Sequence, residues 1–135
     1  MPFVMDTSVT MTWCFDDEVR NTTDALLESL VETYAVVPKL WDYEVSNVLI
    51  IANRKGRISE SNIIRFLKLL EDLPIVVDDV TVNRARLFEI GRYHSLTAYD
   101  ASYIELSQRL GLGFATLNLS LRQACKSSGV NVLEI

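Results

Sequence analysis

Short apolar runs alternate with amphipathic, helix-like segments along this chain of 135 residues. The runs predicted to be strands are 1–5, 35–38, 74–79, 113–117 and 130–135. The segments predicted to be helices are 24–34, 40–56, 60–73, 80–95, 97–110 and 118–128. Strands that alternate with helices pair in parallel through crossover connections, and the helices then cover both faces of the sheet. We therefore predict a three-layer α/β/α fold with a central, mainly parallel sheet of about four or five strands.

The length of the chain suits one compact domain, residues 1–135, with a single well-formed core. The sequence contains no repeat, linker or low-complexity segment. No apolar run approaches the length of a membrane span, and the N-terminal "MPFVMDTSV" lacks the basic region of a signal peptide. These features predict a cytoplasmic protein with no membrane association.

The cysteine and histidine content excludes several kinds of catalytic site. Cys14 and Cys125 are far apart and match no zinc or redox motif, so both are predicted to be reduced, packed thiols. His94 is the only histidine, which argues against a Ser-His-Asp triad, a Cys-His pair or a zinc site. Any catalysis must therefore depend on carboxylates.

The net charge of −5 argues against a protein that holds nucleic acid by bulk charge. Such a chain needs either a local basic patch or a bound cation to approach a phosphate backbone. Tight binding to duplex DNA by this chain alone is therefore not expected.

Four polar residues, scattered along the chain, are predicted to meet at one edge of the sheet. Asp6 follows the first strand, and Asn118 follows the strand 113–117. Glu44 lies near the start of the helix after the second strand, and Asp100 near the start of the helix that leads into 113–117. In open parallel sheets, ligands bind beyond the carboxyl ends of the strands. Converging carboxylate oxygens suit Mg²⁺ or Mn²⁺, which activate water and neutralise phosphate charge.

Each of these acids also has an ordinary structural explanation. Asp6 with Thr7 or Ser8 matches a helix N-cap, and Thr97 with Asp100 matches a capping box. Glu44 matches a favourable acid in a first helical turn. A cap, however, does not explain why Asp100 shares a helix side with apolar neighbours, and three such explanations coinciding at one edge favour a site.

The stretches "VMDTSV", "WDYEVSNVL", "LTAYDASYIELSQRLGLGFATLNLSL" and "GVNVLEI" together resemble the PIN-domain ribonucleases, and more narrowly the VapC-type toxins of bacterial toxin–antitoxin pairs. The resemblance runs nearly end to end, and the "YDASYIELS…FATLN" block is its most specific part. It implies a metal-dependent endoribonuclease toxin that uses Mg²⁺ or Mn²⁺. It also implies an RNA substrate, a homodimer, and a cognate antitoxin that occludes the cleft and supplies any DNA binding.

The same resemblance assigns roles to residues. The catalytic set falls on Asp6, Glu44, Asp100 and Asn118, with Asp6 and Asp100 as metal ligands. Polar positioning roles fall on Thr7, Ser8 and Thr116.

Asn118 departs from the family, which usually has an acid at this position. An amide oxygen can still coordinate a metal or a water, but it brings no charge. The departure leaves open a non-catalytic PIN-like module that keeps only partner binding. A phosphate-accepting signalling domain is a third alternative, ranked last because Asp6 has no paired acid beside it and no Lys follows Thr116.

Overall fold

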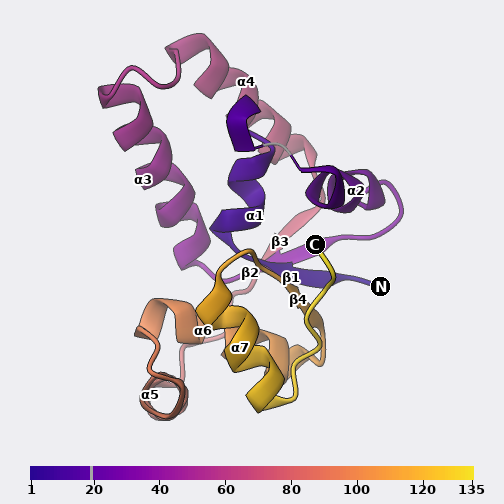
Figure 1. Cartoon of the computed structure of the whole chain (residues 1–135), viewed down its shortest axis with the longest axis vertical. Coiled ribbons are helices and arrows are strands. Elements are labelled where there is room, and N and C mark those ends of the chain that lie inside the picture. Colours follow the sequence, from indigo (N-terminus) through magenta and orange to yellow (C-terminus); the bar gives the residue numbers. More distant parts are fainter. Residues whose placement is uncertain (19) are drawn as a thin grey trace.

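The computed structural model describes every residue except Val19 (Figure 1). Within the described residues the sheet has four strands, all parallel, in the order β3-β2-β1-β4. The strands are β1 (Phe3–Met5), β2 (Ala35–Val37), β3 (Ile75–Val77) and β4 (Gly113–Ala115). The first strand therefore lies between β2 and β4, and its carboxyl end is flanked by theirs.

Helices cover both faces of this sheet. They are α1 (Thr7–Thr12), α2 (Asn21–Ser29), α3 (Leu40–Arg54), α4 (Glu60–Asp72), α5 (Arg84–His94), α6 (Ala98–Leu110) and α7 (Leu119–Ser128), with a short 3₁₀ turn η1 (Asp16–Glu18). Figure 1 shows α1 to α4 on one side of the sheet and α5 to α7 on the other. The three-layer α/β/α prediction is confirmed. None of the described helices is long and apolar enough to cross a membrane.

The core is divided by the sheet into two apolar layers. Phe3 and Met5 point into the layer beneath α1, α3 and α4, whereas Val4 points into the layer beneath α6 and α7. Successive side chains of a strand alternate between the two faces. Burial on both faces explains why the strands read as unbroken apolar runs rather than as alternating patterns.

Two sequence-based expectations for the secondary structure are wrong, and one short helix was not predicted. The helix predicted for 24–34 spans Asn21–Ser29, and its N-cap, Arg20, makes no side-chain capping bond. The segment 130–135 is not a strand, because only Val132 forms a bridge, with Phe114. The helix Thr7–Thr12 was not anticipated beyond a capping turn, since its sequence "TSVTMT" is rich in residues of low helix propensity.

The capping bond of Asp6 explains how this short helix forms. Asp6 has extended backbone angles, and its carboxylate accepts a hydrogen bond from the Val9 amide. Thr10 and Thr12 satisfy their hydroxyls by donating to carbonyls one turn back, those of Asp6 and Val9. The residue at the end of β1 therefore begins the next element as well as facing the carboxyl edge of the sheet.

Candidate active site

Asp6 is the buried centre of a polar cluster at the carboxyl edge of the sheet. Asp6 is only 5% exposed, and its backbone amide donates to the Ala115 carbonyl across the β1–β4 pair. One carboxylate oxygen, Oδ1, accepts from Ser8 Oγ at 2.6 Å and from the Val9 amide at 3.3 Å. The other, Oδ2, accepts from the hydroxyl of Thr116, which follows β4. Parallel pairing of β1 with β4 thus brings together residues 110 positions apart.

Burial raises the pKa of the Asp6 carboxyl to about 6. Loss of hydration is the largest cause, and the hydrogen bonds from Ser8, Thr116 and Val9 oppose it only in part. The negative charge of Glu44 raises the pKa further. No Lys or Arg among the described residues forms an ion pair with Asp6. A bound cation would supply the compensating charge that the protein itself does not.

Glu44 connects three helices at this edge. It lies in the second turn of α3, and its Oε1 accepts from Thr7 Oγ1 at 3.2 Å and from the hydroxyl of Tyr103. Its Oε2 receives no hydrogen bond from the described residues. Glu44 therefore has a bonded role beyond that of a favourable helical acid, and one oxygen stays available to a ligand.

Tyr103 contributes a hydroxyl to the site that the sequence analysis did not predict. It is 1% exposed, and its ring stacks parallel to Phe114, with 5.7 Å between centroids and 6° between planes. Burial and the contact with Glu44 raise the pKa of the Tyr103 hydroxyl, so that it remains a donor. The available signal was its type, because a buried tyrosine hydroxyl usually needs a hydrogen-bond partner.

Asp100 lies in the first turn of α6, one turn before Tyr103. Its backbone amide donates to Thr97 Oγ1 at 3.1 Å, which is half of the capping box expected from the sequence. The reciprocal bond is not formed, and the Asp100 carboxylate makes no hydrogen bond with any described residue. Partial burial raises its pKa. Capping therefore accounts for Thr97 and for the Asp100 backbone, but not for the carboxylate.

Asn118 is the N-cap of α7. Its Oδ1 accepts from the Leu121 backbone amide at 3.1 Å, and the backbone amide of Asn118 donates to Thr116 Oγ1 at 3.1 Å. The residue is exposed, and it touches the cluster through Thr116. A place beside a bound metal stays a prediction for Asn118, whereas its cap explains why an amide serves well here.

Two side chains, those of Ser8 and Arg122, hold the loop after β4 in place. Ser8 Oγ accepts from the Leu117 amide at 3.0 Å while donating to Asp6. Arg122 Nη1, which the sequence analysis also missed, donates to the carbonyls of Thr116 at 3.0 Å and Leu133 at 3.3 Å. These bonds hold the Thr116 hydroxyl where it meets Asp6.

The donor chemistry of this edge fits a hard divalent cation. Asp6 and Glu44 lie close enough for the charge of Glu44 to act on Asp6, whereas Asp100, in the first turn of α6, shows no interaction with either among the described residues. Mg²⁺ in proteins commonly uses one or two carboxylates and keeps several waters. In the part of the chain that the structure describes, no three His, Cys, Asp or Glu residues lie close enough to form a complete metal cage. The fit therefore rests on the buried charge of Asp6 and on the oxygen donors, not on a preformed cage.

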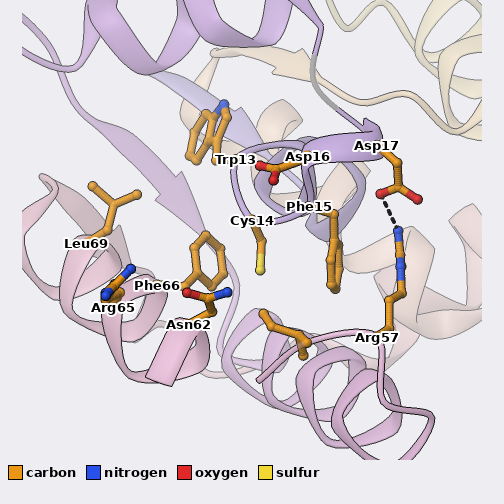
Figure 2. Close-up of a pocket in the computed structure, with 11 residues that line it drawn as sticks. Trp13, Cys14, Phe15, Asp16, Asp17, Arg57, Asn62, Arg65, Phe66 and Leu69 are labelled. Carbon is orange, nitrogen blue, oxygen red and sulfur yellow. Dashed lines mark hydrogen bonds and ion pairs between the residues drawn. The ribbon is translucent and has the colours of Figure 1, made fainter. Parts of the chain in front are cut away.

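A separate aromatic cavity of about 530 Å³ lies between the end of α1 and α4 (Figure 2). Trp13, Phe15 and Phe66 contribute to its lining, and Arg57 at its margin pairs with Asp17 at 2.9 Å. Asp6, Glu44 and Asp100 are not among the residues that line this cavity. It is therefore distinct from the Asp6 cluster.

Comparison with known proteins agrees with the fold and shows the family of the chain. The model of the PIN domain family matches residues 3–127. The crystal structure of PAE2754 from Pyrobaculum aerophilum superposes with a TM-score of 0.66 and 21% sequence identity, covering 92% of this chain and 79% of that chain. The chain has no match among curated proteins. At this identity the solved structure supports the fold alone.

Proposed function

Because the chain belongs to the PIN-domain family, whose members are typically metal-dependent nucleases, we propose that it is a metal-dependent endoribonuclease. The observation that supports this most is Asp6, a buried carboxylate with a pKa raised to about 6 and no cationic partner among the described residues. Buried acids with strongly shifted pKa values are frequent at catalytic sites.

In this proposal Asp6 and Asp100 hold Mg²⁺ or Mn²⁺, and Glu44 completes the acidic set. When bound, such a cation supplies a water of lowered pKa and neutralises charge on the scissile phosphate. Ser8 and Thr116 keep Asp6 oriented through their hydroxyls. Thr7 and Tyr103 occupy one oxygen of Glu44, so that the other can accept the proton of an attacking water.

We extend the proposal to the toxin class, on the strength of the sequence resemblance. A VapC-type toxin would act as a homodimer on cellular RNA, and a cognate antitoxin would bind it and block the cleft. The net charge of −5 supports DNA binding through the antitoxin rather than through this chain. Co-expression with the product of a neighbouring small reading frame, followed by purification of a stable complex, tests this extension. If this chain purifies without that product bound, the toxin–antitoxin extension is contradicted.

A second candidate is a non-catalytic PIN-like module. Asn118 favours it, because an amide at the usual acidic position brings no charge to the cluster. An RNA cleavage assay separates the two candidates. The purified chain should cleave RNA with Mg²⁺ or Mn²⁺, stop in excess chelator, and resume when metal is restored. If no metal condition gives cleavage, the non-catalytic module is the candidate that remains.

Asn118→Asp should increase the response to metal. An aspartate caps a helix as well as an asparagine, and its charge interacts favourably with the N-terminus of α7, which offsets repulsion from Asp6. We therefore expect little change in melting temperature in chelator, a larger gain on adding Mn²⁺ than in the parent, and faster RNA cleavage. Changes of this kind alter metal affinity or activity by roughly 10–100-fold. Equal metal responses in the two proteins would place residue 118 outside the metal site.

Tyr103→Phe should weaken catalysis while keeping the ring that packs on Phe114. The variant removes only the hydroxyl that donates to Glu44, leaving Thr7 as the remaining donor to that carboxylate. We expect kcat to fall roughly 10-fold or more with little change in KM, and the free energy of unfolding to fall by about 1–2 kcal/mol. The exposed Tyr93→Phe is the matched control. An unchanged kcat would show that Tyr103 serves only the fold.

A further inference from the structure

An open groove of about 610 Å³ lies along α3 and the start of α6, and Glu44 is one of its lining residues. Tyr43, Asn47 and Ile50 line it from successive turns of α3, and Tyr99 lines it from α6. Tyr43 is 79% exposed and Tyr99 is 67% exposed. Two large aromatic side chains thus stand in solvent beside a carboxylate of the candidate site.

Tyr43 and Tyr99 are neighbours of the acidic residues in the sequence as well as in the fold. Tyr43 directly precedes Glu44, and Tyr99 directly precedes Asp100. The bond between the Tyr103 hydroxyl and Glu44 holds α6 against α3, and so fixes the two tyrosines relative to the acids.

The lining of the groove limits what it can hold. Among the described residues that line it there is no Lys or Arg, and Glu44 is the charged one. It therefore cannot hold a nucleic acid by its phosphates. Exposed aromatic faces bind bases by stacking, which needs no charge, and Ser46 and Asn47 add hydrogen-bonding groups. Paired bases hide their faces inside a duplex.

We propose that this groove is a base-stacking subsite, in which Tyr43 and Tyr99 hold about two unpaired RNA bases next to the carboxylate cluster. The proposal rests on the proposed ribonuclease function and specifies how an acidic protein gains affinity for its substrate. Since stacking replaces phosphate contacts, binding of single-stranded RNA should depend only weakly on salt. Duplex RNA of the same length should bind much more weakly.

The test measures binding in chelator, where metal-dependent cleavage cannot interfere. The probe is a fluorescently labelled single-stranded RNA of about eight nucleotides, with its duplex as comparison. Tyr43→Ala and Tyr99→Ala should each weaken binding by about 5- to 100-fold, the range expected when a stacking partner is lost. Tyr43→Phe and Tyr99→Phe should bind like the parent, because they keep the aromatic face. Tyr93→Ala, at an equally exposed tyrosine on α5, should also bind like the parent.

Parallel sedimentation identifies the competing occupant, a second copy of the chain. If the alanine variants bind RNA like the parent but lose dimer mass, the groove is a dimer interface and the proposal is overturned. Steep salt dependence, or equal binding of duplex and single strand, also overturns it. The two proposals fail separately, because a parent that binds RNA through these tyrosines but never cleaves it defeats the ribonuclease proposal alone.

Discussion

Asp6→Asn is expected to abolish metal-dependent RNA cleavage and, at the same time, to stabilise the protein in chelator. Cleavage should fall by roughly 100-fold or more, because the variant loses a charged oxygen ligand of the proposed metal site. Stability should rise because the native carboxylate is buried at a cost, as its pKa of about 6 indicates. The gain has an upper bound of about 3 kcal/mol at neutral pH, from about 1.4 kcal/mol for each unit of pKa shift.

The pH dependence of this stabilisation has a definite sign. Since the folded pKa of Asp6 lies above the unfolded value, the native state holds more protons than the unfolded state between about pH 4 and pH 6. The contribution of Asp6 to stability therefore falls as pH rises through that window and stays low above it. The asparagine variant lacks this titration, so its advantage should be greatest at pH 7 and disappear below about pH 4.

Chelator-containing melts of the parent and Asp6→Asn across this pH range measure the effect. Asp42→Asn provides the control. Asp42 is exposed in the first turn of α3, so this substitution removes the same charge from a carboxylate that is not buried. A variant that melts below the parent at pH 7 would show that the hydrogen bonds from Ser8 and Thr116 outweigh desolvation.

Asp100→Asn is expected to remove cleavage to a similar extent, with little effect on stability. The capping bond to Thr97 uses the backbone amide of Asp100, which the substitution leaves in place. The carboxylate has no hydrogen bond with the described residues to lose, and its partial burial raises its pKa, so the neutral amide should be tolerated or slightly favourable. Cleavage assays and thermal melts of the purified variant measure both effects.

Asp24→Asn is the matched control for Asp100→Asn, since Asp24 is also a half-buried acid in the first turn of a helix, α2. It should cleave RNA like the parent. Should Asp100→Asn melt far below the parent, its carboxylate is structural, and the loss of activity would then reflect unfolding rather than a lost ligand.

Strand ends were the most informative part of the sequence. The alternation of apolar runs with helices fixed parallel pairing, and parallel pairing placed the residues after β1 and β4 at one edge. That reasoning suffices to bring the end of β1 beside the end of β4, because it depends on topology and not on side-chain conformation. The role of Thr116, which the structure places against Asp6, came from the family resemblance. The reasoning from apolar runs failed for Val130 to Ile135, where an apolar run forms only a bridge at Val132. Apolar content alone does not separate a strand from a covering segment.

Contacts between helices were beyond this reasoning. The bond between Tyr103 and Glu44 joins residues 59 positions apart, and it depends on how α6 rotates against α3. Periodicity shows which side of a helix is apolar, but not which polar atom it meets there. The same limit applies to Arg122, whose bonds to two carbonyls require the folded positions of β4 and the C-terminal segment.

Titration with Mn²⁺ tests the central claim, that Asp6 and its neighbouring carboxylates hold a catalytic divalent cation. Free Mn²⁺ is followed by electron paramagnetic resonance in the presence of the parent, Asp6→Asn or Asp42→Asn. We predict one tight class of site in the parent and in Asp42→Asn, displaced by Mg²⁺, and its loss in Asp6→Asn although that variant is folded. Mn²⁺ binding of the same strength in Asp6→Asn and in the parent would contradict the account.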